Sequence, residues 1–250
     1  MMLATPGLTW AQQVEVNVEG DYPQLQDNAE AFLGAVEGRS AGSLRRYAST
    51  AEAQVEEALR ALGYYSPMIQ WEVVEQPGDD ETPARLVLTV QPGEPIRVRS
   101  RQVSIEGPAS RDPDFVGTLP EKPSEGDVLN HGQYSTLRQT IQNRAPRLGY
   151  FDGEFTTRRL EVNPEQHTAD ISLVFRSGVR YRLGEVSFKE GHGFEEQLLE
   201  QFVRFEPGEI YHADKVARLS GDLSNSGYFS GVDIDASPGK AEEGVIPVSV

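Results

Sequence analysis

One short phrase occurs three times in this chain of 250 residues, each time between a helix-like and a strand-like stretch. The copies begin at Gly63, Gly149 and Gly227, so they lie 86 and 78 residues apart. They read Gly63-Tyr64-Tyr65, Gly149-Tyr150-Phe151 and Gly227-Tyr228-Phe229. Regular spacing of a motif indicates repeated structural modules. The sequence therefore predicts three copies of one small module, and a function that a tandem array can perform.

Each predicted module has the order strand, helix, helix, strand, strand. The opening strands alternate β-branched or aromatic residues with polar ones and end at a glycine, over residues 16–20, 103–107 and 186–191. In the first copy, Ser49 and Glu52 have the spacing of a capping box, which predicts a helix start. The repeated glycine follows the last apolar residue of the second helix, where a left-handed position favours glycine.

The fold class that follows is α+β. The last two strands of a module can pair as a hairpin, whereas the first can join them only through the helical crossover. Packing both helices on one face buries their apolar stripes. We expect three tandem domains, each a small mixed three-stranded sheet with two helices on one face, at residues 14–95, 96–178 and 179–250. Residues 1–13 fit a signal-peptide remnant, a mis-assigned start or a disordered terminus.

The junctions between modules are short and carry arginine. Residues 96–99 and 179–182 are preceded by Pro92-Gly93 and Ser177-Gly178 and lead into an opening strand. Such short junctions predict a semi-rigid array. A change in the parity of the apolar residues predicts a bend or bulge there. The arginines are candidates for contacts between modules, or alternatively for a solvated face: Arg97, Arg99, Arg180 and Arg182.

Composition excludes several classes of function. The formal net charge of −16 disfavours nucleic acid and anionic membrane surfaces as general partners. The middle third of the chain has no net charge, whereas the parts on either side are acidic. This difference is either random variation among solvated surfaces or the mark of a distinct docking face. The chain has no cysteine, so disulfides and thiolate metal sites are excluded.

No pattern in the sequence predicts an enzyme. The histidines His131, His167, His192 and His212 lack metal-ligand spacing. A nucleophile elbow and a phosphate-binding loop are both missing. We therefore expect no catalytic, metal-binding or cofactor-binding residues and no cofactor.

The repeat resembles the POTRA domain, and its details are most similar to the POTRA region of the TamA family of outer-membrane assembly proteins. The residues that carry the resemblance are Leu59–Pro67, Val128–Tyr134, Arg147–Phe155 and Gly178–Gly184. The resemblance implies three domains before an outer-membrane barrel, so the chain is expected to be a periplasmic fragment that lacks its own C-terminal barrel. It also implies a role in outer-membrane protein assembly and autotransporter secretion. The implied partners are a TamB-like protein anchored in the inner membrane and unfolded outer-membrane proteins.

The resemblance further implies that the second strand of each sheet lies at an edge, where another chain can add a strand. These strands are expected at residues 68–75, 154–162 and 229–236. Ile69 and Trp71 are expected in the core, with Met68, Gln70 and Glu72 exposed. The candidate partner-binding residues are Met68, Gln70, Glu72, Glu154, Asp233 and Asp235. The Gly-Tyr pairs are expected to be structural: Gly63, Tyr64, Gly149, Tyr150, Gly227 and Tyr228.

Two alternatives remain open at this point. The array could be a rigid scaffold or spacer between membranes. It could also supply the POTRA domains of a dedicated two-partner secretion pore, although such pores typically carry two domains.

Overall fold

The computed structural model describes residues 13–36, 38–75, 83–189 and 193–250. It divides into two compact units. The first comprises Met1–Ser100, Pro123–Gln133 and Glu161–Asp170, and the second Arg101–Lys122, Tyr134–Leu160 and Ile171–Val250. The predicted three-domain boundaries stay a prediction, and most of the segment 1–13 lies outside the described residues.

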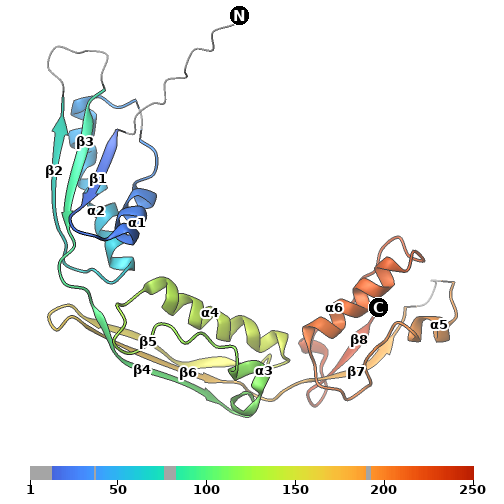
Figure 1. Cartoon of the computed structure of the whole chain (residues 1–250). Helices are drawn as coiled ribbons and strands as arrows, with labels where there is room; N and C mark the ends of the chain where they lie inside the picture. The colour runs from blue at the N-terminus through green and yellow to red at the C-terminus, as the bar shows by residue number, and fades with distance from the viewer. Residues whose placement is uncertain (1–12, 37, 76–82, 190–192) are drawn as a thin grey trace, which may run out of the picture. The chain divides into compact units, whose positions relative to one another are not determined.

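The first sheet has the predicted mixed, three-stranded form (Figure 1). Its order is β1 (Val14–Val18), β3 (Arg85–Gln91) and β2 (Met68–Val74), with β1 parallel and β2 antiparallel to β3. Every second residue of β3 is buried, and these residues form one core with α1 (Pro23–Leu33) and α2 (Ala41–Ala61). Because β3 is central, its apolar face anchors the whole module.

The second helix of this module begins earlier than predicted. Ser40 is the N-cap of α2, and its hydroxyl accepts the N–H of Ser43. Ser49 lies inside the helix, so the predicted helix start there is wrong. Ala48 and Leu44 are fully buried, and burial along this additional segment favours the longer helix.

The second sheet repeats the first, with the order β4 (Arg97–Glu106), β6 (Thr168–Arg176) and β5 (Glu154–Asn163). Its long helix is α4 (His131–Arg147), which contains Pro146 only in its last turn. The first helix of the module is reduced to the short segments η1 (Pro108–Arg111) and α3 (Pro113–Val116). The second strand therefore lies at a sheet edge in both complete sheets, as predicted.

The third sheet pairs only β7 (Arg182–Ser187) with β8 (Val245–Ser249), in parallel and with a register shift that matches the predicted bulge. Two helices, α5 (Glu196–Glu200) and α6 (Ala213–Asn225), precede β8. Leu219 and Leu223 of α6 pack into the core of this module with Leu183 and Ile246.

The predicted strand over residues 229–236 is wrong among the described residues of the third module. The segment makes a single bridge, between Asp235 and Ser249. The Asp235 carboxylate accepts the N–H of Ser237 at 3.1 Å and binds Lys240 at 2.5 Å. These bonds turn the chain into the short helix η2 (Pro238–Lys240) instead of extending the strand.

Candidate partner-binding edge and module joints

A three-stranded sheet has two edges, and in the first sheet one of them is covered by a side chain. The Gln26 amide, on α1, lies against the outer side of β1. Its Nε2 donates to the Val16 carbonyl at 2.5 Å, and its Oε1 accepts the Val18 N–H at 2.9 Å. The amide thus takes the place of a neighbouring strand, so another chain cannot pair there without displacing Gln26.

The other edge, along β2, is different because its outward backbone groups can be assigned. The Val90 carbonyl accepts from Glu19 and the Leu86 N–H donates to Gln13, so these β3 residues face β1. Their β2 partners Ile69 and Val73 therefore belong to non-hydrogen-bonded pairs. It follows that the N–H and C=O groups of Ile69, Trp71 and Val73 point out of the sheet.

The side chains of β2 agree only in part with the sequence expectation. Met68, Gln70 and Glu72 are exposed as predicted, and Met68 is 66% exposed. Trp71, predicted to be in the core, is 42% exposed. Trp71 pairs with the fully buried Leu88 and therefore lies on the core face of the sheet. Because β2 is the edge strand, no strand on its outer side shields the Trp71 ring from solvent. An incoming strand on β2 would therefore meet an apolar ring beside free backbone groups.

The other predicted edge residues differ in their contacts. Glu154 is exposed at the start of the edge strand β5, with one carboxylate oxygen 3.9 Å from Arg176. Asp233 is exposed, but it does not lie in a strand. The carboxylate of Asp235 already binds Lys240 and Ser237, and its backbone pairs with Ser249. The geometry thus favours β2, and the binding role of all six candidates stays a prediction.

The repeated glycine forms a joint with the segment that enters the next module. In the first unit, the N–H of the buried Ile96 donates to the Gly63 carbonyl at 2.8 Å. The Ile96 carbonyl in turn accepts the N–H of Leu129 at 2.8 Å. A Cβ on Gly63, which has φ of +93°, would collide with the Leu129 carbonyl oxygen. Glycine is therefore required here both for the helix end and for close approach.

The same joint recurs within the second unit. The N–H of Tyr181 donates to the Gly149 carbonyl at 2.9 Å, and its carbonyl accepts the N–H of Tyr211 at 3.0 Å. The Phe151 ring packs edge-on against Tyr181 and Tyr211, with centroids 5.4 and 4.9 Å away. The Gly-Tyr motif thus ends the helix and also binds the extended segment that enters the next module.

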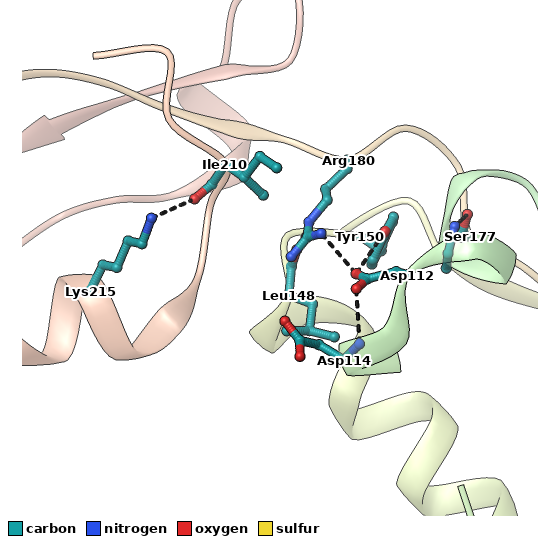
Figure 2. A network of polar contacts seen from close by, with 9 residues as sticks. Asp112, Asp114, Leu148, Tyr150, Ser177, Arg180, Ile210 and Lys215 are labelled. Atoms are coloured by element: carbon teal, nitrogen blue, oxygen red, sulfur yellow. Dashed lines mark hydrogen bonds and ion pairs between the residues drawn. The ribbon is translucent and has the colours of Figure 1, made fainter. Parts of the chain in front are cut away.

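A buried ion pair reinforces this second joint (Figure 2). The Arg180 guanidinium lies 2.8 Å from the Asp112 carboxylate and donates through Nε to the Leu148 carbonyl at 2.9 Å. Tyr150 donates its hydroxyl to the same carboxylate at 3.0 Å. Burial, and then the bond to Asp112, raise the pKa of Tyr150 to about 12. The Arg180 side chain of the entering segment is therefore held by two groups of residues 98–178, the Asp112 carboxylate and the Leu148 carbonyl.

Sequence reasoning singled out Arg180 but missed Asp112, its partner. The only available signal was its position as helix cap before Pro113, where Asp112 accepts the N–H of Asp114. The pairing itself depends on tertiary structure and has no local signature.

The remaining arginine candidates bind within one repeat. Arg97 donates to the Gly126 carbonyl at 2.9 Å, and Arg182 donates to the Gly208 carbonyl at 2.6 Å. Arg99 forms an ion pair with Asp170, which raises the pKa of Arg99 and lowers that of Asp170. These contacts join the first strand to the turn before the second helix, or to the third strand. A role for Arg97, Arg99 and Arg182 between modules stays a prediction.

The first joint also contains a histidine. The Tyr65 hydroxyl lies 2.6 Å from Nε2 of His131, which opens α4. Burial, and then the nearby Arg60 charge, lower the pKa of His131, while burial raises the pKa of Tyr65. In the neutral imidazole, Nε2 can either accept the tyrosine proton or donate to the tyrosine oxygen, depending on the tautomer.

Over the described ranges, no group of three or more acidic or histidine side chains is arranged to hold a metal ion. None of the described helices is both long and apolar enough to cross a membrane. The described residues thus form a tandem array of small α+β modules with an open sheet edge along β2 and hydrogen-bonded joints.

Comparison with known families gives this class a name. A model described as POTRA domain TamA domain 1 matches residues 15–92. The POTRA model, described as surface antigen variable number repeat, matches residues 98–178 and 181–250. The chain belongs to the POTRA domain family.

Solved structures with similarity include other POTRA regions. POTRA domains 3–5 of BamA from Haemophilus influenzae are 18% identical, with 96% of this chain and 94% of that chain covered and a TM-score of 0.46. The N-terminal domain of Omp85 from Thermosynechococcus elongatus is 18% identical, covering 94% and 93%, with a TM-score of 0.33. CdiB from Escherichia coli is 14% identical, covering 84% of this chain and 34% of that one, with a TM-score of 0.34. The family assignment rests on the two family models.

Proposed function

We propose that this chain is the periplasmic POTRA array of an outer-membrane assembly protein of the TamA type. In this role it aids the insertion or secretion of outer-membrane proteins and autotransporters. Its partners are a TamB-like protein anchored in the inner membrane and unfolded client strands. The observation that carries the proposal is the open β2 edge, where Ile69, Trp71 and Val73 direct their backbone groups outward beside an exposed indole ring.

Strand addition at this edge suits a protein that handles many clients. Backbone pairing does not depend on the client's sequence, and the Trp71 ring adds apolar contact for alternate client side chains. Because the Gln26 amide covers the outer side of β1, a strand is directed to β2. The acidic surface keeps the array away from anionic lipid headgroups, which also suits a soluble binding region.

A scaffold function is the second candidate, and the joints favour it. Two residues of the entering segment bind the second repeat. Arg180 binds Asp112 and the Leu148 carbonyl, and the N–H of Tyr181 donates to the Gly149 carbonyl. A spacer needs such joints but has no need of an open edge. The two functions are compatible. A probe placed at the β2 edge distinguishes them, because only the binding function requires contact there.

The experiment places a photo-crosslinking residue at Gln70 in the full-length protein in cells. Gln70 lies in β2 but its side chain is exposed, so the probe leaves the outward backbone groups free. A probe at Glu57, exposed on α2, is the matched control. Capture of unfolded outer-membrane proteins or of the inner-membrane partner from Gln70, and not from Glu57, supports the proposal. Equal capture from both positions would remove the edge as the binding site.

A further inference from the structure

The helix α4 differs from the rest of this acidic chain in its charge. None of the 39 acidic residues of the chain lies within His131–Arg147, whereas Arg138, Arg144 and Arg147 all do. The helix belongs to the middle third of the chain, where the sequence left open a distinct docking face. Its surface is therefore the place to look for a partner of opposite charge.

One face of α4, together with the start of α6, lines a groove of about 450 Å³ within the second unit. The lining positions of α4 recur three and four residues apart, which places them on a single face of the helix. All of them carry hydrogen-bond donors in their side chains. They are Thr136, Gln139, Thr140, Asn143, Arg144 and Arg147.

The groove has a net positive charge. At its α6 side, Nδ1 of His212 accepts the N–H of Asp214 at 3.1 Å, so the neutral ring carries its proton on Nε2 as a donor. Asp214 is the only acidic residue among the described residues that line the groove, and its carboxylate lies 3.1 Å from Arg147. Arg144 donates to the Phe115 carbonyl at 2.9 Å, which leaves its charge uncancelled.

The shape and chemistry of the groove fit an extended peptide. From Thr136 to Arg147 the helix is about 16 Å long, which equals about five residues of an extended chain. The hydroxyl and amide groups of Thr140, Asn143 and Gln139 can both donate to and accept from a peptide backbone. The guanidinium groups at the end of the helix match carboxylates. A small anion would use only that end, and the charge of −16 repels a polyanion such as nucleic acid.

We propose that this groove is a docking site for an extended acidic segment of a partner protein, about five residues long. The carboxylates of the segment bind Arg144, Arg147 and the Nε2 of His212, and its backbone bonds the polar face of α4. The segment competes with Asp214 for Arg147. This second binding surface is a helix face, so it does not depend on strand addition at β2.

Two neighbouring residues of α4 provide a matched pair of variants. The intact chain is titrated against a fluorescein-labelled five-residue peptide of alternating glutamate and threonine, followed by fluorescence anisotropy. Asn143→Asp places a carboxylate in the groove, four residues before Arg147, and should weaken binding by about tenfold. Gln142→Glu adds the same charge at an exposed position that does not line the groove, and should weaken binding by less than about twofold.

A third variant is expected to act in the opposite direction. Asp214→Asn removes the competing carboxylate from Arg147 and should tighten peptide binding by about threefold. Melting followed by circular dichroism shows that each variant is folded, since all three positions are exposed.

The competing ligands are tested in the same assay. A peptide with glutamine in place of glutamate should bind at least about tenfold more weakly. Inorganic phosphate or vesicles of anionic lipid that displace the acidic peptide at equal concentration of negative charge would overturn the proposal. Absence of peptide binding, equal weakening by Asn143→Asp and Gln142→Glu, or weaker binding by Asp214→Asn would also overturn it.

Discussion

Glycine at positions 63 and 149 serves two needs at once. The positive φ angles, +93° and +85°, suit the end of a helix. The missing side chain leaves room for Leu129 at Gly63, and for Tyr181 and Tyr211 at Gly149. A Cβ on Gly149 would lie 2.9 Å from the Tyr211 Cβ. An alanine at either position would therefore disturb both the helix end and the joint. The Gly-Tyr motif is therefore repeated for two reasons: it ends a helix, and it forms a joint with the following segment.

The ion pair of Asp112 and Arg180 gives the first prediction. Asp112→Ala leaves a largely buried guanidinium without its counter-charge and the Tyr150 hydroxyl without its acceptor. We expect the second unit to lose about 3 kcal/mol of unfolding free energy, the range seen when one member of a buried pair is removed. Chemical denaturation measures the loss.

The matched control is Arg147→Met, which removes the exposed pair with Asp214, whose side chains are 65% and 59% exposed. This pair should contribute less than about 1 kcal/mol. Equal losses in the two variants would show that the Asp112 pair does not hold the joint.

His131 gives a pH-dependent prediction. Its folded pKa lies below the unfolded value of 6.5, so the contribution of neutral His131 to stability is complete above pH 6.5. As the pH falls below 6.5, the unfolded state takes up the proton first, and stability decreases. In an NMR titration, Arg60→Met should raise the pKa of His131 without restoring it fully, because burial is the larger cause. An unchanged pKa would exclude Arg60 as a contributor.

At the level of elements, the strand β2 differs from β1 in what its edge can accept. Outward backbone groups alternate along β2 with groups bonded to β3, so neighbouring positions should respond differently to proline. Val73→Pro removes an outward N–H, whereas Glu72→Pro removes a ladder hydrogen bond. We expect Val73→Pro to fold but lose client capture, and Glu72→Pro to lose more stability, as thermal melting would show.

Val73→Ala is the control for the lost side chain, since it keeps the N–H and should keep client capture. Loss of capture in Val73→Ala, or full capture in Val73→Pro, would mean that backbone pairing at this edge is not the binding mode.

Much of the element order could be predicted from the sequence, because alternation in strands and periodicity in helices are local signals. The buried alternation of Leu86, Leu88 and Val90 is of this kind. The start of α2 at Ala41 and the exposure of Trp71 were missed, because both depend on how far neighbouring elements cover the sheet. Residues 229–236 carried strand-like residues, but the turn at Asp235 competed with them. The closing of β1 by Gln26 is likewise a tertiary contact without a sequence signal.

At the scale of the whole molecule, the first module should fold by itself. Every fully buried member of its core lies between Val14 and Val90. A fragment of residues 1–95 lacks Ile96 and Leu129, which seat against Gly63 in the intact chain. We therefore expect a cooperative melting transition at a lower temperature than in the intact chain, measured by circular dichroism. A fragment without cooperative melting would contradict the predicted boundary at residue 95.

The proposed binding surface of the array is the outward backbone of β2 rather than a set of side chains. The most direct test is hydrogen exchange of the β2 amides, with and without an unfolded outer-membrane barrel protein. The account predicts fast exchange at Ile69, Trp71 and Val73 in the free protein and protection at these three positions on binding, with little change at Met68, Gln70 and Glu72. Protection confined to the helices α1 and α2, or none along β2 despite binding, would contradict it.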